Sequence, residues 1–478
     1  MFGRTKRMHF VGIGGVGMSG IAELLVNLGY EVSGSDLEAS MVTDRLKNLG
    51  AEVFIGHDAG QICSADVVIV SSAIRMDNPE VVEANQRKIP VIPRAEILAE
   101  LMRLRYSIAV AGAHGKTSTT SMVAFVLEQG KLDPTAIIGG HFSAFGSNVR
   151  FGRGDFVVAE ADESDRSFLL LSPTVAVITN IDREHLESYG SFKDLRNAFL
   201  RFSNKVPFYG VVVVCVDDPN LRSLVPQMTR RVVTYSLETS DADVYGSSVE
   251  LKDFDARCKV RVGGGMVSKE IIGVLDLHVP GRHNLLNGLA AVAVGLELGL
   301  SIEQVTDALG KFRGVERRFH LCGEVDGVLV VDDYAHHPTE IEAVLSTARE
   351  SFCRRVVVGF QPHRYSRTRD LLGEFGTALA GADEIVLTNI YSAGEERLPG
   401  VGVKELAEVV RSSTKAKVQV VEEVEEMASA LVGVTRPGDL VLTLGAGSIG
   451  QIGPQIIDVL KKRGLSGENS PEESDDVQ

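Results

Sequence analysis

Residues 107–118, SIAVAGAHGKTS, place a short apolar strand, a glycine turn and the start of a helix in immediate succession. The glycines of such a turn expose backbone N–H groups to phosphate oxygens, its lysine adds positive charge beside the phosphates, and its threonine hydroxyl binds Mg²⁺. Val110 stands where the GxxxxGK(S/T) pattern has its first glycine, and a solvated lysine at a helix start is the alternative interpretation. The stretch predicts an α/β fold with a nucleotide phosphate loop made of Gly112, Ala113, His114, Gly115, Lys116, Thr117 and Ser118.

A second glycine loop lies upstream, where GIGGVG (12–17) follows the apolar run Met8–Val11 and precedes a helical pattern. Backbone N–H groups in a GxGxxG turn approach a pyrophosphate closely, and Asp36 follows at about the distance where an acid accepts from ribose hydroxyls. The loop therefore predicts a dinucleotide or nucleotide-diphosphate site. A glycine turn that serves only close helix packing is the alternative.

Polar segments follow two further predicted strands of the central region. EADESD (160–165) comes directly after Phe156–Ala159, and TNIDREH (179–185) closes the strand that begins at Val175. A phosphate-bound Mg²⁺ takes oxygen ligands, and α/β sheets bind ligands at the carboxyl ends of their strands. These segments are candidate metal and nucleotide contacts, with a solvated acidic turn as the alternative for the first.

Strand and helix patterns alternate through three units of the chain, each of which starts as strand, glycine turn and helix. The pattern restarts near residues 105 and 315. We expect domains at 1–105, 106–314 and 315–463, followed at 464–478 by a disordered acidic tail that contains no lysine or arginine.

Composition limits the class of protein. The 478 residues are 44% hydrophobic and 24% charged, enough for about three packed domains. A net charge of −15 gives no basis for nucleic-acid binding, and the five cysteines show neither a disulfide framework nor metal-type spacing. The glycines after Met8 argue against a signal peptide, and no apolar run is long enough for a membrane span. We expect a cytoplasmic protein that binds neither nucleic acid nor membrane.

Together these motifs resemble those of the Mur ligases, which add amino acids to the peptidoglycan precursor. The resemblance covers nearly the whole chain up to about Lys462. It is carried by MHFVGIGGVGMSG (8–20), AGAHGKTSTT (111–120), EADESD (160–165), TNIDREHLESYG (179–190), PGRHNLLNG (280–288), ERRFH (316–320), DDYAHHPTEI (332–341), FQPHRYSRTRDL (360–371) and GAGSIG (445–450).

The resemblance implies three domains: a Rossmann-like N-terminal domain for a UDP-sugar, a central P-loop-type ATPase domain, and a Rossmann-like C-terminal domain that brings the amino acid. It implies the alanine-adding branch, in which L-alanine, ATP and UDP-N-acetylmuramate give the amide, ADP and phosphate. The first glycine loop would then hold the UDP pyrophosphate. The implied UDP-sugar contacts are Gly14, Gly15, Val16, Gly17, Asp36, His57, Ser72 and Arg94.

The resemblance also implies roles for the ATP site and the C-terminal domain. Lys116 would contact ATP phosphates, Thr117 and Glu160 would bind Mg²⁺, and His185 would bind a second Mg²⁺. Other nucleotide contacts would be Asn180, His283, Asn287 and Asp332. The residues implied to close over the reacting groups or to bind a carboxylate or phosphate are Arg318, His336, His337, His363, Arg364 and Arg367.

The implied reaction accounts for these residue types. A carboxylate becomes a good acyl donor by taking the γ-phosphoryl group of ATP, so two anions must meet beside cations. The incoming amine must lose a proton, and we expect a histidine of the pair His336–His337 to accept it. Some relatives carry a carbamylated lysine about 15 residues after the metal-site histidine, but Leu200 stands there, so we expect no carbamate. Glu184 also replaces an aspartate that the family often has before that histidine.

Three other functions remain open at this stage. A nicotinamide-dependent oxidoreductase would use GIGGVG and Asp36 but leaves the second loop unexplained. A ligase that recycles murein peptides would act on the same nucleotide. A regulatory nucleotide-binding protein would keep the sites without catalysis. We expect a monomer or weak homodimer.

Overall fold

The computed structural model describes residues 5–71, 73–142, 147–264, 266 and 270–467. Within these ranges the strands form three sheets, of five, ten and six strands, which confirms the predicted α/β class. The chain divides into two compact units. The first unit comprises Met1–Val249, Arg257–Leu277 and Asn284–Arg313, and the second comprises Glu250–Ala256, His278–His283 and Gly314–Gln478.

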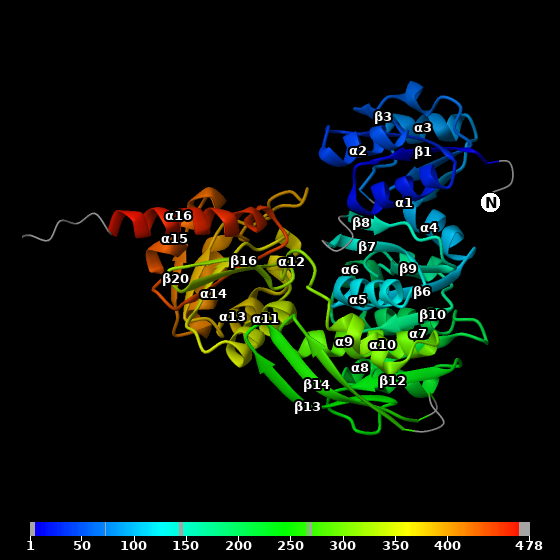
Figure 1. Cartoon of the computed structure of the whole chain (residues 1–478). Helices are drawn as coiled ribbons and strands as arrows, with labels where there is room; N and C mark the ends of the chain where they lie inside the picture. The colour runs from blue at the N-terminus through cyan, green and yellow to red at the C-terminus, as the bar shows by residue number, and fades with distance from the viewer. Residues whose placement is uncertain (1–4, 72, 143–146, 265, 267–269, 468–478) are drawn as a thin grey trace, which may run out of the picture. The chain divides into compact units, whose positions relative to one another are not determined.

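The first sheet is parallel, with the strand order β3-β2-β1-β4-β5. Figure 1 labels its strands β1 and β3 and the helices around them. Its elements are β1 (Arg7–Val11), α1 (Val16–Asn27), β2 (Glu31–Asp36), α2 (Met41–Leu49), β3 (Glu52–Ile55), η1 (Ala59–Ile62), β4 (Val67–Val70), α3 (Pro79–Gln86), β5 (Val91–Pro93) and α4 (Arg94–Met102). The central strand β1 is buried from Met8 to Val11, as its apolar sequence predicts. Its carboxyl end leads directly into the first glycine loop.

The second sheet has the order β15-β14-β13-β12-β11-β10-β6-β9-β7-β8. Its strands are β6 (Tyr106–Ala111), β7 (Thr135–Phe142), β8 (Ser147–Arg150), β9 (Phe156–Glu160), β10 (Val175–Ile178), β11 (Val211–Cys215), β12 (Val232–Ser236), β13 (Val244–Lys252), β14 (Asp255–Val262) and β15 (Ile271–Leu277). The helices of this region are α5 (Lys116–Gln129), η2 (Ser167–Leu170), α6 (Leu186–Tyr189), α7 (Phe192–Ser203), α8 (Pro219–Leu224), η3 (Val225–Gln227), α9 (Arg282–Glu297) and α10 (Ile302–Leu309). Strand β6 pairs in parallel with β9 and β10, so the ends of these three strands lie at one edge.

The third sheet has the order β16-β17-β21-β18-β19-β20, and its edge strand β16 is antiparallel. Its elements are β16 (His320–Val325), β17 (Val328–Asp333), α11 (Pro338–Ser351), β18 (Val356–Phe360), α12 (Tyr365–Asp370), α13 (Leu372–Leu379), β19 (Glu384–Leu387), α14 (Val403–Ser413), β20 (Lys417–Val420), η4 (Val424–Glu426), α15 (Met427–Val434), β21 (Leu440–Leu444), η5 (Ser448–Gln451) and α16 (Ile452–Gly467). Helices α11, α13 and α14 share one core with Val331 and Val358, while α15 and α16 share another with Val330 and Val357. Because neighbouring residues of a strand face opposite ways, both faces of this sheet are covered.

The tip of the hairpin formed by β13 and β14 belongs to the second unit. The ring of Phe254 contacts Phe319 and Phe352, with centroids 6.2 and 5.1 Å apart. The backbone N–H of Asp253 donates to the carbonyl of Ser351 at 2.9 Å. The core of this unit therefore includes residues that lie far from it in sequence.

The C-terminal prediction needs a correction. The disordered tail was expected from Gly464, but α16 continues to Gly467 because no proline interrupts the chain before Pro471. The rest of the predicted tail, 468–478, lies outside the described residues. No described helix combines the length and the apolar composition that a bilayer crossing requires.

Candidate active site

The predicted phosphate loop connects β6 to α5, and Lys116 is the first residue of that helix. Its Nζ donates to the carbonyls of Gly112 and Ala113 at 2.5 and 3.0 Å, and to Oε1 of Glu163 at 2.9 Å. The side chain of Lys116 is 19% exposed. Burial works against its charge, but Glu163 outweighs that effect and raises the pKa of Lys116. The lysine is therefore a charged group at the base of the loop.

The loop is fixed by residues that follow β10. The Asn180 side chain accepts from the His114 N–H at 2.8 Å and donates to the His114 carbonyl at 3.0 Å. That carbonyl also accepts from Thr179 Oγ1 at 2.7 Å. A Cβ at Gly112 would lie 2.0 Å from Thr179 Oγ1, so only glycine permits this approach. Asn180, predicted as a nucleotide contact, shapes the loop backbone here.

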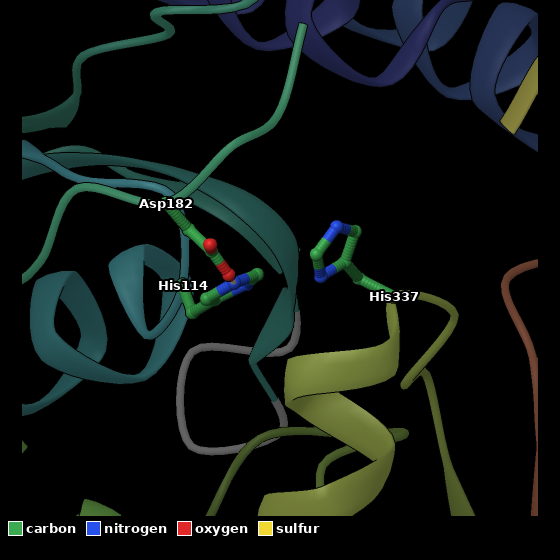
Figure 2. A group of neighbouring side chains, drawn as sticks. All are labelled: His114, Asp182 and His337. Atoms are coloured by element: carbon green, nitrogen blue, oxygen red, sulfur yellow. Dashed lines mark hydrogen bonds and ion pairs between the residues drawn. The ribbon is translucent and has the colours of Figure 1, made fainter. Parts of the chain in front are cut away.

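The His114 side chain is held within the first unit. Its Nε2 lies 2.8 Å from Oδ2 of Asp182 (Figure 2). The pair joins the phosphate loop to the TNIDREH segment, as the predicted convergence of strand ends requires. Thr117 and Ser118, the next predicted contacts, are each 9% exposed in the first turn of α5.

Glu163 is a site residue that the sequence interpretation did not single out. It is 2% exposed, and its carbonyl accepts from the Tyr189 hydroxyl at 2.5 Å. Burial raises the pKa of Glu163 to about 7, against the opposing effect of Lys116. Its Oε2 has no hydrogen-bond partner among the described residues.

His185, a predicted metal ligand, lies next to this carboxylate. Ligand atoms of Glu163, Glu184 and His185 all lie within 4.8 Å of one another. The predicted ligand Glu160 has another position, since its Oε1 accepts from the Gly139 N–H at 2.7 Å. The carboxylates beside His185 are therefore those of Glu163 and Glu184, and not that of the predicted ligand Glu160.

The first glycine loop is held by the acid predicted beside it. The Gly14 N–H donates to Oδ2 of Asp36, at the end of β2, at 2.8 Å. Gly17 lies against Arg94, the first residue of α4, and a Cβ there would be 2.5 Å from Arg94 Nη1. Gly15 precedes α1, and Val16 is the first residue of that helix. Asp36 therefore supports the loop, and Gly17 makes room for a cation beside it.

One cavity of about 330 Å³ joins the two glycine loops. Its lining includes Gly15, Gly17 and Arg94 from the first sheet, and Lys116 and Glu160 from the second. Asp162 also lines it, with Oδ2 3.9 Å from Arg94 Nη2. The cavity brings two predicted phosphate-binding loops and two cationic side chains to the same space within the first unit.

Of the predicted UDP-sugar contacts, Gly15, Gly17 and Arg94 line this cavity, whereas Gly14, Asp36 and His57 are not part of its lining. His57 has its Nδ1 2.9 Å from Ser35 Oγ and 3.0 Å from Oε2 of the fully buried Glu80. Ser72 lies outside the described residues, and its neighbour Ser71 lines the cavity.

The predicted adenine contacts belong to different units. In the first unit, Asn287 accepts from Thr119 Oγ1 at 3.0 Å and so joins α9 to α5. In the second unit, His283 Nδ1 lies 3.5 Å from Thr347 Oγ1. Burial lowers the pKa of His283 to about 4, with a smaller contribution from Arg318.

In the second unit, the buried Asp332 pairs with Arg317, which is not among the predicted site residues. Nε of Arg317 donates to Oδ2 of Asp332 at 3.0 Å, and Nη2 donates to the Gly445 carbonyl at 2.5 Å. Thr443 Oγ1 donates to the other oxygen of Asp332 at 2.7 Å. The predicted residue Arg318 instead has its guanidinium carbon 5.1 Å from the Tyr334 ring centroid and Nη1 3.8 Å from Glu340.

The acidic side chains of Asp333 and Glu340 hold the DDYAHHP segment in place. Asp333 accepts from the Phe319 and Ala335 N–H groups, and burial raises its pKa to about 6. His336 Nδ1 lies 3.3 Å from Oε2 of Glu340. His337 is 3% exposed and precedes α11.

The predicted basic motif lies at the carboxyl end of β18. The His363 ring lies 5.5 Å from that of His336 and is stacked on Tyr391, while its Nδ1 is 3.4 Å from Arg367 Nη1. Burial, His336 and the arginines lower the pKa of His363 to about 3. Arg364, with φ of 71°, precedes α12. A neutral histidine beside two guanidinium groups is suited to an anionic ligand.

Three models of one family match this chain. "Mur ligase family, catalytic domain" matches residues 7–106, "Mur ligase middle domain" matches 110–295, and "Mur ligase, glutamate ligase domain" matches 317–447.

Individual proteins are similar over almost the full length. The chain is 50% identical to UDP-N-acetylmuramate--L-alanine ligase from Geobacter sp. (strain M21), covering 96% of this chain and 99% of that protein. It is 52% identical, at the same coverage, to the protein of that name from Anaeromyxobacter dehalogenans (strain 2CP-C). Among solved structures, UDP-N-acetylmuramate-alanine ligase from Thermotoga maritima has a TM-score of 0.79 at 33% identity, covering 96% of this chain and 99% of that one.

Proposed function

The chain belongs to the Mur ligase family, and from this premise we propose that it joins L-alanine to the lactyl carboxylate of UDP-N-acetylmuramate. ATP is the co-substrate, and the products are UDP-N-acetylmuramoyl-L-alanine, ADP and phosphate. Relatives that share half of its residues over nearly the full length carry the name of this ligase. The reaction is a step of peptidoglycan synthesis.

The shared cavity is the observation in the structure that carries this proposal. A ligase of this kind must bring a carboxylate on a nucleotide-sugar to the γ-phosphate of ATP. The lining of the cavity includes Gly15 and Gly17 of the first glycine loop, Arg94, and Lys116 of the phosphate loop. Two anionic substrates can therefore meet in a space lined by two cationic side chains, which offset their mutual repulsion.

The chemistry follows from this arrangement. The lactyl carboxylate attacks the γ-phosphate, the bond to ADP breaks, and the resulting acyl phosphate has a good leaving group. We assign Lys116 to the charge on the transferring group and Arg94 to the UDP-sugar. The amine of L-alanine then attacks the acyl carbon and releases phosphate. The acceptor of its proton stays a prediction, one of His336 and His337.

We propose Mg²⁺ as the cofactor. The buried Oε2 of Glu163, which lacks a partner among the described residues, fits a cation, as do the hydroxyl of Thr117 and the imidazole of His185. When bound, Mg²⁺ supplies positive charge that offsets the phosphate oxygens.

The competing functions have less support. The relatives at 50% and 52% identity are named for alanine addition, which disfavours peptide recycling. A nicotinamide oxidoreductase would leave Lys116 and its loop without a role. We further propose a cytoplasmic location, supported by five cysteines that are all free. The oligomeric state stays a prediction of monomer or weak homodimer.

Phosphate release from ATP tests the proposed function. We expect release when UDP-N-acetylmuramate and L-alanine are both present, and only background release when either is left out. Each amino acid is assayed singly, with glycine and L-serine beside L-alanine, because a methyl or hydroxyl difference in a pocket is worth about 1–3 kcal/mol. Release that does not depend on both substrates, or micromolar NADH binding without UDP-N-acetylmuramate binding, would contradict the proposal.

The substitution Gly17→Ala tests the UDP-sugar side of the cavity. Its Cβ would lie 2.5 Å from Arg94 Nη1 and 3.0 Å from Cζ, so the end of that flexible side chain must move. We expect KM for UDP-N-acetylmuramate to rise about tenfold, or about 1.4 kcal/mol, with KM for ATP unchanged. Gly373→Ala, in α13, is the matched control because a Cβ there meets nothing within 4 Å. Equal KM values in both variants would exclude Arg94 from substrate binding.

A further inference from the structure

A buried hydrogen-bond network lies next to the first glycine loop, in the first sheet. Its centre is Glu80, in the first turn of α3, which is 0% exposed. Oε1 of Glu80 lies 3.1 Å from His9 Nε2, and Oε2 accepts from the Ser35 hydroxyl at 2.6 Å. Oε2 also lies 3.0 Å from His57 Nδ1. One buried carboxylate therefore connects β1, β2, α3 and the segment that follows β3.

His57 is joined to the first glycine loop through the backbone. The N–H of Gly56 donates to the carbonyl of Asp36 at 2.7 Å, and the carboxylate of Asp36 accepts from the Gly14 N–H at 2.8 Å. The side chain of His57 is 12% exposed, and both of its contacts within the described residues are made by Nδ1. Its other ring nitrogen, Nε2, is therefore the atom that remains for a nucleotide bound at this loop.

The surroundings of Nδ1 determine which nitrogen of the neutral His57 ring carries the hydrogen. Ser35 uses its hydroxyl hydrogen on Glu80, so its oxygen faces Nδ1, at 2.9 Å, with lone pairs. The carboxylate oxygen of Glu80 faces the same nitrogen with lone pairs as well. Two acceptors at one ring nitrogen require that nitrogen to be the donor. The neutral ring therefore carries its hydrogen on Nδ1, which leaves Nε2 as an acceptor.

We propose that Glu80 is a positioning residue for the UDP-sugar, because it fixes the His57 ring with Nε2 as a hydrogen-bond acceptor for the nucleotide. Glu80 is fully buried, so it acts on the ligand through His57 and not by contact. His57 is not part of the lining of the cavity that joins the two glycine loops, so its effect falls on nucleotide affinity and not on phosphoryl transfer. The inference rests on the proposed function for the identity of the nucleotide.

Nitrogen NMR of the full chain with isotope-labelled histidine, in mildly alkaline buffer, tests the state of the ring. We expect wild-type His57, assigned by the loss of its signals in His57→Ala, to carry its hydrogen on Nδ1. In Glu80→Met the Ser35 hydroxyl loses its acceptor and can donate to Nδ1, so the hydrogen should move to Nε2. Glu83→Met, in the same helix, removes a carboxylate that pairs with Arg87 at 2.6 Å and should leave the ring unchanged. Hydrogen on Nε2 of wild-type His57 overturns the proposal without any variant.

Calorimetric titration with UDP tests what the acceptor does. We expect Glu80→Met to raise Kd for UDP and KM for UDP-N-acetylmuramate at least about tenfold, with kcat and KM for ATP unchanged and Glu83→Met like the wild type. Glu80→Met combined with His57→Ala should bind UDP no more weakly than His57→Ala alone, because the first residue acts through the second. Additive losses, or wild-type UDP affinity in Glu80→Met, overturn the proposal. If UDP binding responds as expected but the chain releases no phosphate with both substrates, the proposed function fails and the role of Glu80 stands.

Discussion

Replacing Lys116 with methionine is expected to reduce phosphate release by about 10³-fold or more. Its Nζ is the cation at the base of the phosphate loop and lines the cavity that joins the two loops. Methionine keeps most of the apolar stem but supplies no charge where two anions must meet. Release assayed with ATP, UDP-N-acetylmuramate and L-alanine measures the loss.

The fold should survive this substitution. Without Lys116, Glu163 would be buried without its cation, but burial already raises its pKa to about 7, so it takes up a proton near neutral pH. We expect Tm to fall by no more than about 5 °C. Lys193→Ala, at an exposed position in the first turn of α7, is the control and should keep full activity. Activity of Lys116→Met above about a tenth of the wild type would contradict the role of this lysine.

Replacing Arg317 with alanine is expected to destabilise the second unit by about 3–5 kcal/mol. Asp332 is 3% exposed and would keep Thr443 as a donor but lose the guanidinium 3.0 Å away. The Gly445 carbonyl would lose its donor as well. Such a loss is a large part of the 5–15 kcal/mol typical of a domain. Urea unfolding of the full chain, compared with wild type, measures it.

The pH dependence of this destabilisation tests whether the unpaired Asp332 carboxylate causes it. Burial raises the pKa of Asp332 despite the opposing effect of Arg317, so its folded-state pKa lies above the unfolded value. Folding then favours the protonated form of Asp332. Its contribution to stability therefore falls as the pH rises from the unfolded-state pKa to the folded-state pKa. Without Arg317 the folded-state pKa rises further, so the destabilisation should be smallest in acid and grow toward neutral pH. Arg369→Ala, which removes an exposed pair with Asp370, should change nothing measurable.

Strong apolar runs allowed the central strands to be predicted from the sequence. Strand β11, four consecutive valines and a cysteine, is buried on every residue, as is expected of a parallel strand covered on both faces. Helices α2 and α3 bury only two and three residues, so their sequences show no strong apolar stripe, and caps such as Ser40 help to fix where they begin. Helix α4 buries six apolar residues, so its pattern was present in the sequence and was missed. The antiparallel β16 was also missed, since an edge strand shows no continuous apolar run.

The candidate site was predictable where the residue type itself carries the chemistry. Lys116, Asn180 and His185 lie where strand ends converge. The acids of EADESD could not be ranked, because spacing in a turn does not tell which carboxylate faces the lysine; folding buries Glu163 and leaves Glu160 in contact with Gly139. Of the two adjacent arginines only Arg318 was predicted, yet Arg317 is the one that pairs with Asp332, because the backbone turn decides which side chain faces the aspartate.

The composition of the second unit limits how such a chain can be recombined with a relative. Its core takes Phe254 from a hairpin tip that is encoded well before the rest of the unit, and this ring contacts Phe319 and Phe352. A chimera with a single breakpoint at Gly314 would combine aromatic partners from two different parents. Only a chimera that also exchanges the hairpin tip takes all three aromatic residues from one parent. The segment that must be exchanged is therefore larger than the continuous C-terminal part of the chain.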